Sequence, residues 1–178
     1  LAAIALPILG GIGIPLLPFR KRSQMLAYIE TVVAAASVIV WALLPGGTTE
    51  TFHVVHFVND LSISFKIDGM SMVFAGLIAL LWPLATLYAF EYMTHEGHED
   101  RFFAFFIMTF GVVVGIAFAA NFLTMYLFYE FLTLVTLPIV MHQFDNKSRH
   151  AGKMYVLYMM FGASLAFIGF VFVYMFGT

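Results

Sequence analysis

The stretch MYLFYEFLTLVTLP, residues 125–138, decides the fold, because it is an apolar run of helical length that holds one carboxylate. A charged side chain in the hydrocarbon of a membrane costs about 2.5–3.5 kcal/mol on insertion scales, so such residues are rare and commonly functional. The run therefore predicts a membrane-spanning helix. Glu130, close to its middle, is the first candidate for chemistry.

The composition extends this prediction to the whole chain of 178 residues, of which 62% are hydrophobic and 10% charged. Mean hydropathy is +0.97, whereas an average soluble domain has about 25% charged residues. We expect an all-α integral membrane protein that forms a single transmembrane domain over residues 1–178. The absence of cysteine excludes disulfides and thiol chemistry, and the net charge of −2 argues against nucleic acid as a partner. The sequence has no glycine-rich phosphate loop and no pair of mid-span histidines for haem, so we expect no cofactor.

Six segments approach the length of about 20 apolar residues that crosses a bilayer. They cover residues 1–19, 25–45, 69–93, 102–120, 122–142 and 153–176. The first contains Pro7, Pro15 and Pro18, so we expect it to be kinked or incomplete.

A short β-hairpin is predicted between the second and third spans. Residues 61–67 alternate apolar and polar side chains, as a half-buried strand does, and residues 52–58 supply the partner strand across an Asn59–Asp60 turn. Asp68 and Gly69 are expected to end the strand and to open the third span.

The basic residues orient these spans. If the spans alternate in direction, all but one of the lysines and arginines fall on one side, and only Lys66 falls on the other. The residues on the basic side are Arg20, Lys21, Arg22, Arg101, Lys147, Arg149 and Lys153. Because basic loops stay on the cytoplasmic side, both termini and the hairpin are expected to face outward.

Four residues are candidates for chemistry, each with a plainer alternative. Glu130 could load and release a proton, or a protonated Glu130 could only hold helices together. Lys153, at the start of the sixth span, could exchange charge with Glu130 or extend to the interface. Glu30, in the second span, needs a partner or water. His142, at the inner end of the fifth span, could feed protons, since a free histidine has a pKa near 6.5, or could be merely interfacial.

Two further features concern the same regions. Pro138 cannot donate a hydrogen bond to the Leu134 carbonyl and should bend the fifth span, with Thr133 and Thr136 available to serve the freed oxygen. The segment HEGHED, residues 95–100, lacks the spacing of a zinc site, so we expect a solvated linker and no metal.

At this point the sequence resembles a known family. DGMSMVF at residues 68–74, EYM at 91–93, RFFAFF at 101–106 and YLFYEFLTL at 126–134, followed by Pro138 and His142, are similar to the antiporter-like membrane subunits. These subunits occur in respiratory complex I, in membrane-bound hydrogenases and in Mrp-type cation/proton antiporters, and the resemblance is closest to the Mrp D-type branch. It implies that Glu130 is the family's glutamate on the fifth helix, which tunes a buried lysine. Lys153 matches a basic residue at the start of the sixth.

The resemblance also implies a setting. It places the chain in the lipid bilayer of a bacterial or archaeal plasma membrane or an organellar inner membrane, with other membrane subunits as partners and protons or sodium ions as cargo. Family members have about twice as many helices in two inverted repeats, with the pumping lysine on a broken seventh helix. We therefore expect this chain to be the N-terminal portion of a larger subunit, or to find the remainder on a separate polypeptide.

The function that follows is proton or sodium/proton translocation by charge relay through Glu130, within a multisubunit complex. Two alternatives remain: a structural membrane scaffold with no ion path of its own, and half of an unrelated solute transporter. Any enzymatic activity would belong to the parent complex, such as an NADH–quinone oxidoreductase or a hydrogenase-type assembly.

Overall fold

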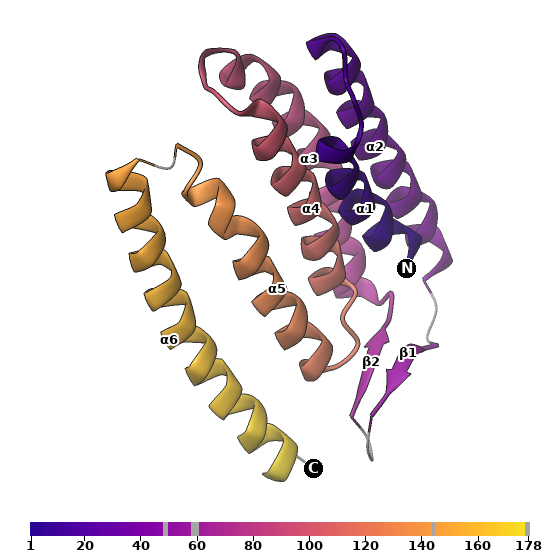
Figure 1. The fold of residues 1–178 in the computed structure, drawn as a ribbon. Coiled ribbons are helices and arrows are strands. Elements are labelled where there is room, and N and C mark those ends of the chain that lie inside the picture. Colours follow the sequence, from indigo (N-terminus) through magenta and orange to yellow (C-terminus); the bar gives the residue numbers. More distant parts are fainter. Residues whose placement is uncertain (48–49, 58–60, 144, 177–178) are drawn as a thin grey trace.

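The computed structural model describes residues 1–47, 50–57, 61–143 and 145–176, which form a helical bundle with a small two-stranded sheet at one end (Figure 1). The helices are α1 (Ala2–Leu16), α2 (Arg22–Leu43), α3 (Gly69–Tyr92), α4 (Glu99–Ala117), α5 (Phe122–Val140) and α6 (Asn146–Phe176). Two short 3₁₀ turns, η1 (Leu44–Gly46) and η2 (Met93–His95), extend α2 and α3. The predicted all-α membrane fold is confirmed, hairpin included.

Helices α2 to α6 are each long and apolar enough to cross a membrane, whereas α1 has only 15 residues. The sequence predicted a first span over residues 1–19, but α1 ends at Leu16. Leu17 adopts an extended conformation, with φ −89° and ψ 129°. The following residue is Pro18, whose ring disfavours helical geometry at the residue before it. The expectation of an incomplete first span is therefore confirmed, and Pro18 gives its physical cause.

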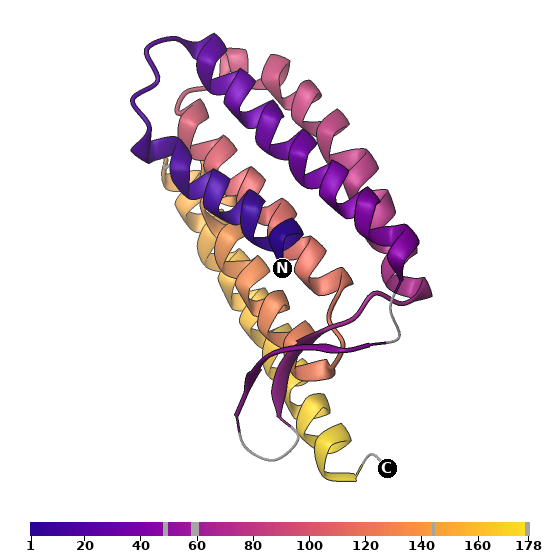
Figure 2. The same cartoon turned by 90° about the vertical axis from the view of Figure 1, so that its right-hand side faces the viewer.

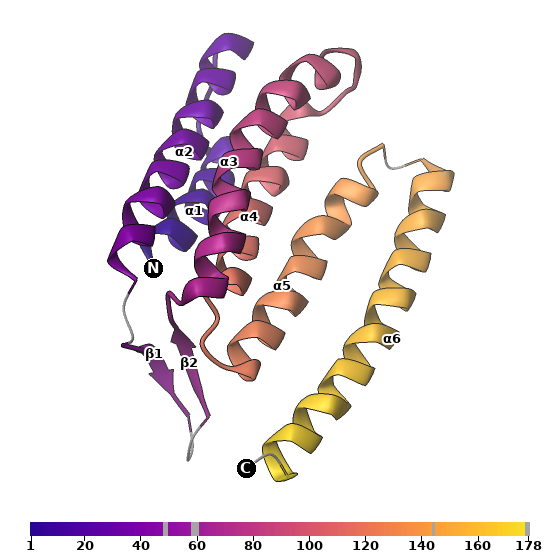
Figure 3. The same cartoon turned by 180° about the vertical axis from the view of Figure 1, so that it is seen from behind.

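Helices α1 to α4 form the packed core; α5 packs against α4 and α6 against α5, so these two form an outer layer (Figures 1 and 3). Ile29, Phe103 and Phe110 are fully buried in that core. Glycine allows α1 and α4 to approach closely, because a Cβ on Gly111 would lie 2.5 Å from the Ile4 carbonyl oxygen. In contrast, the described part of α6 buries only two residues, Gly152 and Ala163.

The hairpin pairs β1 (Phe52–His56) with β2 (Ser62–Phe65) in antiparallel register, Phe52 opposite Phe65. As predicted, β2 is half-buried, but its buried side chains are Ser62 and Ser64, which are 5% and 2% exposed. The reason is polar docking: the Asn121 amide donates to the Ser62 carbonyl at 2.6 Å and to the Ser64 hydroxyl at 2.8 Å. The predicted Asn59–Asp60 turn lies outside the described residues.

Asp68 ends this region and opens α3, as predicted. Its carboxylate accepts hydrogen bonds from the Ser71 N–H at 2.8 Å and the Ser71 hydroxyl at 2.9 Å. These bonds stabilise the ionised form and hold the pKa of Asp68 below its usual range.

The direction of the chain alternates from helix to helix, so both termini lie at the hairpin end of the bundle (Figures 1 and 2). Leu1 shares a surface hollow with Phe52 and Phe65, and Tyr174 shares another with Ser62. The loops and helix starts that carry Arg20, Arg101 and Arg149 lie at the opposite end, which we call the basic end. The predicted separation of charge is therefore present; which end faces the cytoplasm remains a prediction.

Candidate functional site

Glu130 lies near the middle of α5, about 12 Å along the helix axis from its first residue at 1.5 Å per residue. The side chain is half-buried. Its Oε1 atom is fully buried and has no hydrogen-bond partner among the described residues. Leaving a buried polar atom unsatisfied costs about 1–3 kcal/mol, and more for a charged group. The site is therefore incomplete without a proton, water, a cation or another protein segment.

Hydroxyl groups lie along α5 on either side of Glu130, and Tyr126 and Thr136 among them contact α6. The Tyr126 hydroxyl, one turn earlier, interacts with the Glu130 carboxylate. Toward the basic end come Thr133 and then Thr136, whose hydroxyl lies 2.6 Å from the Tyr155 hydroxyl of α6. From Glu130 to Thr136 the rise is about 9 Å. We call Tyr126, Thr133, Thr136 and Tyr155 the hydroxyl row.

The two threonines do not serve the carbonyl that Pro138 leaves free, and that expectation was wrong. Thr133 donates to the Tyr129 carbonyl at 3.3 Å, and Thr136 donates to the Leu132 carbonyl at 2.8 Å. The hydroxyl of a threonine in a helix reaches the carbonyl oxygen of the residue three or four positions earlier. Leu134 is not at that spacing before either Thr133 or Thr136, so neither hydroxyl reaches its carbonyl oxygen.

Lys153 does not meet Glu130 directly. It is exposed on the second turn of α6, where it lines a cavity of about 720 Å³ together with Leu137 of α5. Leu137 is about 10 Å further along the helix than Glu130. Within the described ranges no ion pair joins Lys153 to Glu130. Of the hydroxyl row, Thr133 and Thr136 lie between the level of Glu130 and that of the cavity, whereas Tyr126 lies on the other side of Glu130.

His142 faces α4 instead of the hydroxyl row. Its Nε2 atom lies 2.7 Å from the Gly97 carbonyl oxygen, which can only accept, so Nε2 carries a hydrogen and donates this bond. Its ring packs edge-on against Phe102, and its backbone carbonyl accepts a hydrogen bond from the Arg101 guanidinium. The buried Nδ1 atom has no hydrogen-bond partner in the described part of the chain.

Glu30 occupies a separate place. It lies on α2, which packs against α1, α3 and α4. The side chain is half-buried, and its Oε2 atom is a second buried carboxylate oxygen for which the described residues provide no hydrogen bond. Glu30 and Glu130 are therefore two distinct intramembrane carboxylates, one in the core and one in the outer layer.

Two arginines have roles that the sequence did not reveal. Arg22 donates to the Phe90 carbonyl at 2.7 Å and pairs with Glu99 at 2.8 Å, and Arg101 binds the His142 carbonyl. Arg22 therefore binds a carbonyl oxygen near the C-terminal end of α3, and Arg101 binds one just beyond the end of α5. The helix dipole is negative at such ends, so a cation there is favourable. The only signal in the sequence was their place in the basic loops. For Tyr126, the signal was its spacing of one turn from Glu130.

Comparison with known proteins gives matches over much of the chain. A family model described as "NADH-Ubiquinone oxidoreductase (complex I), chain 5 N-terminus" matches residues 56–103. The A-type subunit of the Na(+)/H(+) antiporter of Alkalihalophilus pseudofirmus is 29% identical over 133 residues, which are 72% of this chain and 16% of that protein. The chloroplastic "NAD(P)H-quinone oxidoreductase subunit 5" of Chara vulgaris is 27% identical over 122 residues, 64% of this chain and 18% of that protein.

Two solved structures share the fold. A chain of respiratory complex I from Thermus thermophilus superposes with a TM-score of 0.72 and 24% identity, covering 91% of this chain and 33% of that chain. A chain of an archaeal membrane-bound sulfane sulfur reductase superposes with a TM-score of 0.78 and 16% identity. This match covers 97% of the present chain and 36% of that chain. The chain thus spans about a third of these chains, and less than a fifth of the two curated relatives (16% and 18%). Those relatives are named as an A-type antiporter component and as an oxidoreductase subunit 5, so the D-type branch stays a prediction.

Proposed function

We propose that this chain, a homologue of the antiporter-like membrane subunits of complex I and of multisubunit cation/proton antiporters, forms part of a path that carries protons or sodium ions across a membrane. Glu130 is the group that gains and loses a proton in this path. The observation that carries the proposal is the buried, unpartnered Oε1 of Glu130 within a spanning helix. Ionisable groups in such positions commonly mark proton relays.

The hydroxyl row supplies the connection to the basic end. Hydroxyl groups both donate and accept hydrogen bonds, so together with water they can pass a proton from Thr136 toward Glu130. Lys153, at the cavity beyond this row, holds positive charge where a proton would arrive and sets the local field. His142 and Glu30 are second candidates in this path, since each has one buried atom without a hydrogen bond among the described residues.

Other membrane subunits belong to the proposal. The relatives are named as components of an antiporter and of a quinone oxidoreductase. We expect the parent assembly of this chain to supply the energy and the remaining ion path. In such an assembly, a cation on a neighbouring segment would approach the open side of Glu130 and change its protonation. This chain contributes the carboxylate and its hydroxyl row.

The test is the variant Glu130→Gln in the native complex. Transport is measured as the ion-driven change of pH inside inside-out membrane vesicles. Glutamine keeps the size and hydrogen bonding of the side chain but cannot ionise. We expect transport to fall at least about tenfold, because a proton-transfer group typically contributes about 10²–10⁴-fold to a rate. The complex should still assemble on a native gel.

The matched control is Glu91→Gln, the same chemical change at an exposed carboxylate at the end of α3. It should transport like the native protein. Full transport in Glu130→Gln would refute the relay and favour the scaffold alternative. If this variant fails to assemble, Glu130→Asp, which keeps an ionisable group but shortens its side chain, decides the question. A changed pH dependence of transport in Glu130→Asp supports the relay, and an unchanged rate and pH profile contradicts it.

A further inference from the structure

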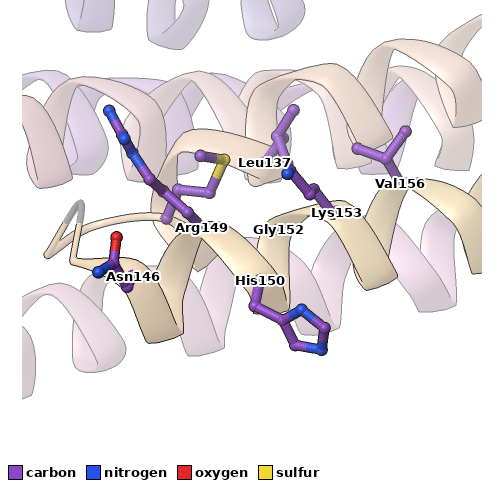
Figure 4. A pocket seen from close by; sticks show the side chains of 8 residues that line it. Leu137, Asn146, Arg149, His150, Gly152, Lys153 and Val156 are labelled. Carbon is purple, nitrogen blue, oxygen red and sulfur yellow. The ribbon is translucent and has the colours of Figure 1, made fainter.

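A cavity of about 720 Å³ opens between α5 and α6 at the basic end. Leu137 of α5 and Met141, which follows the end of α5, form one wall, and Arg149, Lys153 and Val156 of α6 line the other. Figure 4 shows Arg149 and Lys153 directed to the same side, together with Asn146, while the ring of His150 points away from them. The cavity therefore combines two cations on one side with an apolar wall.

The length of α6 places these cations at the membrane surface. The helix has 31 residues, about 46 Å at 1.5 Å per residue, whereas the hydrocarbon of a bilayer is about 30 Å thick. The sequence has no Asp, Glu, Lys or Arg after Lys153. Residues 154–176 alone cover about 34 Å and fill the hydrocarbon. Arg149 and Lys153, one turn apart, are then at the level of the lipid headgroups.

Acidic side chains do not neutralise the cavity. Among the described residues that line it, none is an aspartate or a glutamate. The nearest acid in the sequence, Asp145, accepts a hydrogen bond from the Ser148 N–H at 2.6 Å and so caps the start of α6. This bond holds the pKa of Asp145 below its usual range. Asp145 therefore stays ionised, but it is bound to Ser148 and is not among the residues that line the cavity, whose charged side chains Arg149 and Lys153 are positive.

We propose that this cavity binds the headgroup of an anionic phospholipid, with Arg149 and Lys153 on the phosphate and the first acyl carbons against Leu137 and Val156. Arginine binds phosphate oxygens through two parallel N–H donors, and basic pockets between spanning helices are suited to such headgroups. The apolar wall favours a lipid over a free phosphate ion. The site shares Lys153 and the cavity with the proposed ion path, but its test is lipid binding and not transport, so the failure of one proposal does not decide the other.

The experiment measures lipid binding by native mass spectrometry, with the purified full-length protein in phosphatidylcholine nanodiscs titrated with phosphatidylglycerol. The double variant Arg149→Gln/Lys153→Gln should bind phosphatidylglycerol about 25-fold more weakly, from roughly fivefold for each charge. Lys147→Gln is the matched control, because it removes one positive charge from the first turn of α6, close to Arg149. Lys147 is not among the residues that line the cavity. It should change the affinity for phosphatidylglycerol by less than about twofold, because the attraction between a more distant charge and the headgroup is screened by salt.

Three outcomes would overturn the proposal. Equal losses in Lys147→Gln and Arg149→Gln would mean attraction to the general surface charge. Displacement of phosphatidylglycerol by inorganic phosphate would identify a site for a soluble anion. If the double variant does not fold, the single variant Arg149→Gln and the charge-keeping Arg149→Lys/Lys153→Arg carry the test, and native affinity in Arg149→Gln contradicts the site.

Discussion

At the scale of single residues, Asn121 joins two parts of the fold. Its Oδ1 atom accepts a hydrogen bond from the Thr124 N–H at 2.8 Å and caps α5. Its Nδ2 atom donates to the Ser62 carbonyl and the Ser64 hydroxyl of β2. One amide group therefore both starts the helix that carries Glu130 and holds the hairpin in place.

Aspartate at position 121 separates these two roles. Asn121→Asp keeps the oxygen that caps α5 but replaces the amide donor by an oxygen, which the Ser62 carbonyl repels. We expect amide hydrogens of residues 61–66 to exchange faster, with α5 still protected. Asn121→Ala should in addition lose the cap and destabilise the fold by about 0.5–2 kcal/mol. Hydrogen exchange detected by mass spectrometry measures both effects, and native exchange in Asn121→Asp would contradict the assignment.

The sequence could single out Glu130 but not Asn121. Glu130 stands out because every neighbour in its run is uncharged, and that contrast is local. Asn121 depends on Ser62 and Ser64, which precede it by 59 and 57 residues, and a polar residue in a short link has no distinguishing local pattern. The same limit applies to the hydroxyl of Tyr155, whose partner Thr136 is on another helix.

At the scale of elements, hydropathy predicted the five long spans well, because a bilayer imposes their length on the sequence. Alternation predicted that β2 is half-buried, but not which face is buried. In a soluble sheet the apolar face would be inside. Here the polar face docks on hydrogen-bonding groups at the start of α5, while Phe65 on the other face packs edge-on against Phe128 of α5.

The contact between α1 and α4 gives a test at this scale. Gly111→Ala would place a methyl group 2.5 Å from the Ile4 carbonyl oxygen and 2.8 Å from the Ile8 side chain. Separating the helices should cost about 1–3 kcal/mol, the usual range for overpacking. Gly169→Ala is the control, because a Cβ there meets nothing within 4 Å, and it should be neutral or slightly stabilising. Thermal unfolding in detergent compares the two, and equal midpoints would refute the close approach.

At the scale of the whole molecule, the termini and the hairpin lie at one end, and the basic loops lie at the other (Figure 1). This arrangement follows from alternating spans, and the sequence predicted it from the positions of lysine and arginine alone. What the sequence could not predict is the division into a packed core of α1 to α4 and an outer layer of α5 and α6. Hydropathy is similar in all these helices, and only packing distinguishes them.

The orientation in the membrane can be tested against a clean background, because the chain has no cysteine. His56 in β1 and His95 in η2 are both exposed and lie at opposite ends of the bundle. In intact cells, an impermeant thiol reagent should label His56→Cys, and it should label His95→Cys only after permeabilisation. The reverse pattern would place both termini in the cytoplasm and contradict the positive-inside assignment.

The ends of α5 are both anchored. At the hairpin end, the Ala120 N–H donates to the Ser64 carbonyl at 2.9 Å and the Lys66 N–H to the Phe118 carbonyl at 2.8 Å. At the basic end, the His142 ring and the Arg101 guanidinium make the second attachment. Mechanically, α5 is a beam clamped at its two ends. Such a beam bends least at its ends and most at its middle. Thermal bending of α5 would therefore move Glu130 in and out of contact with its surroundings, while the ends of the helix stay in place.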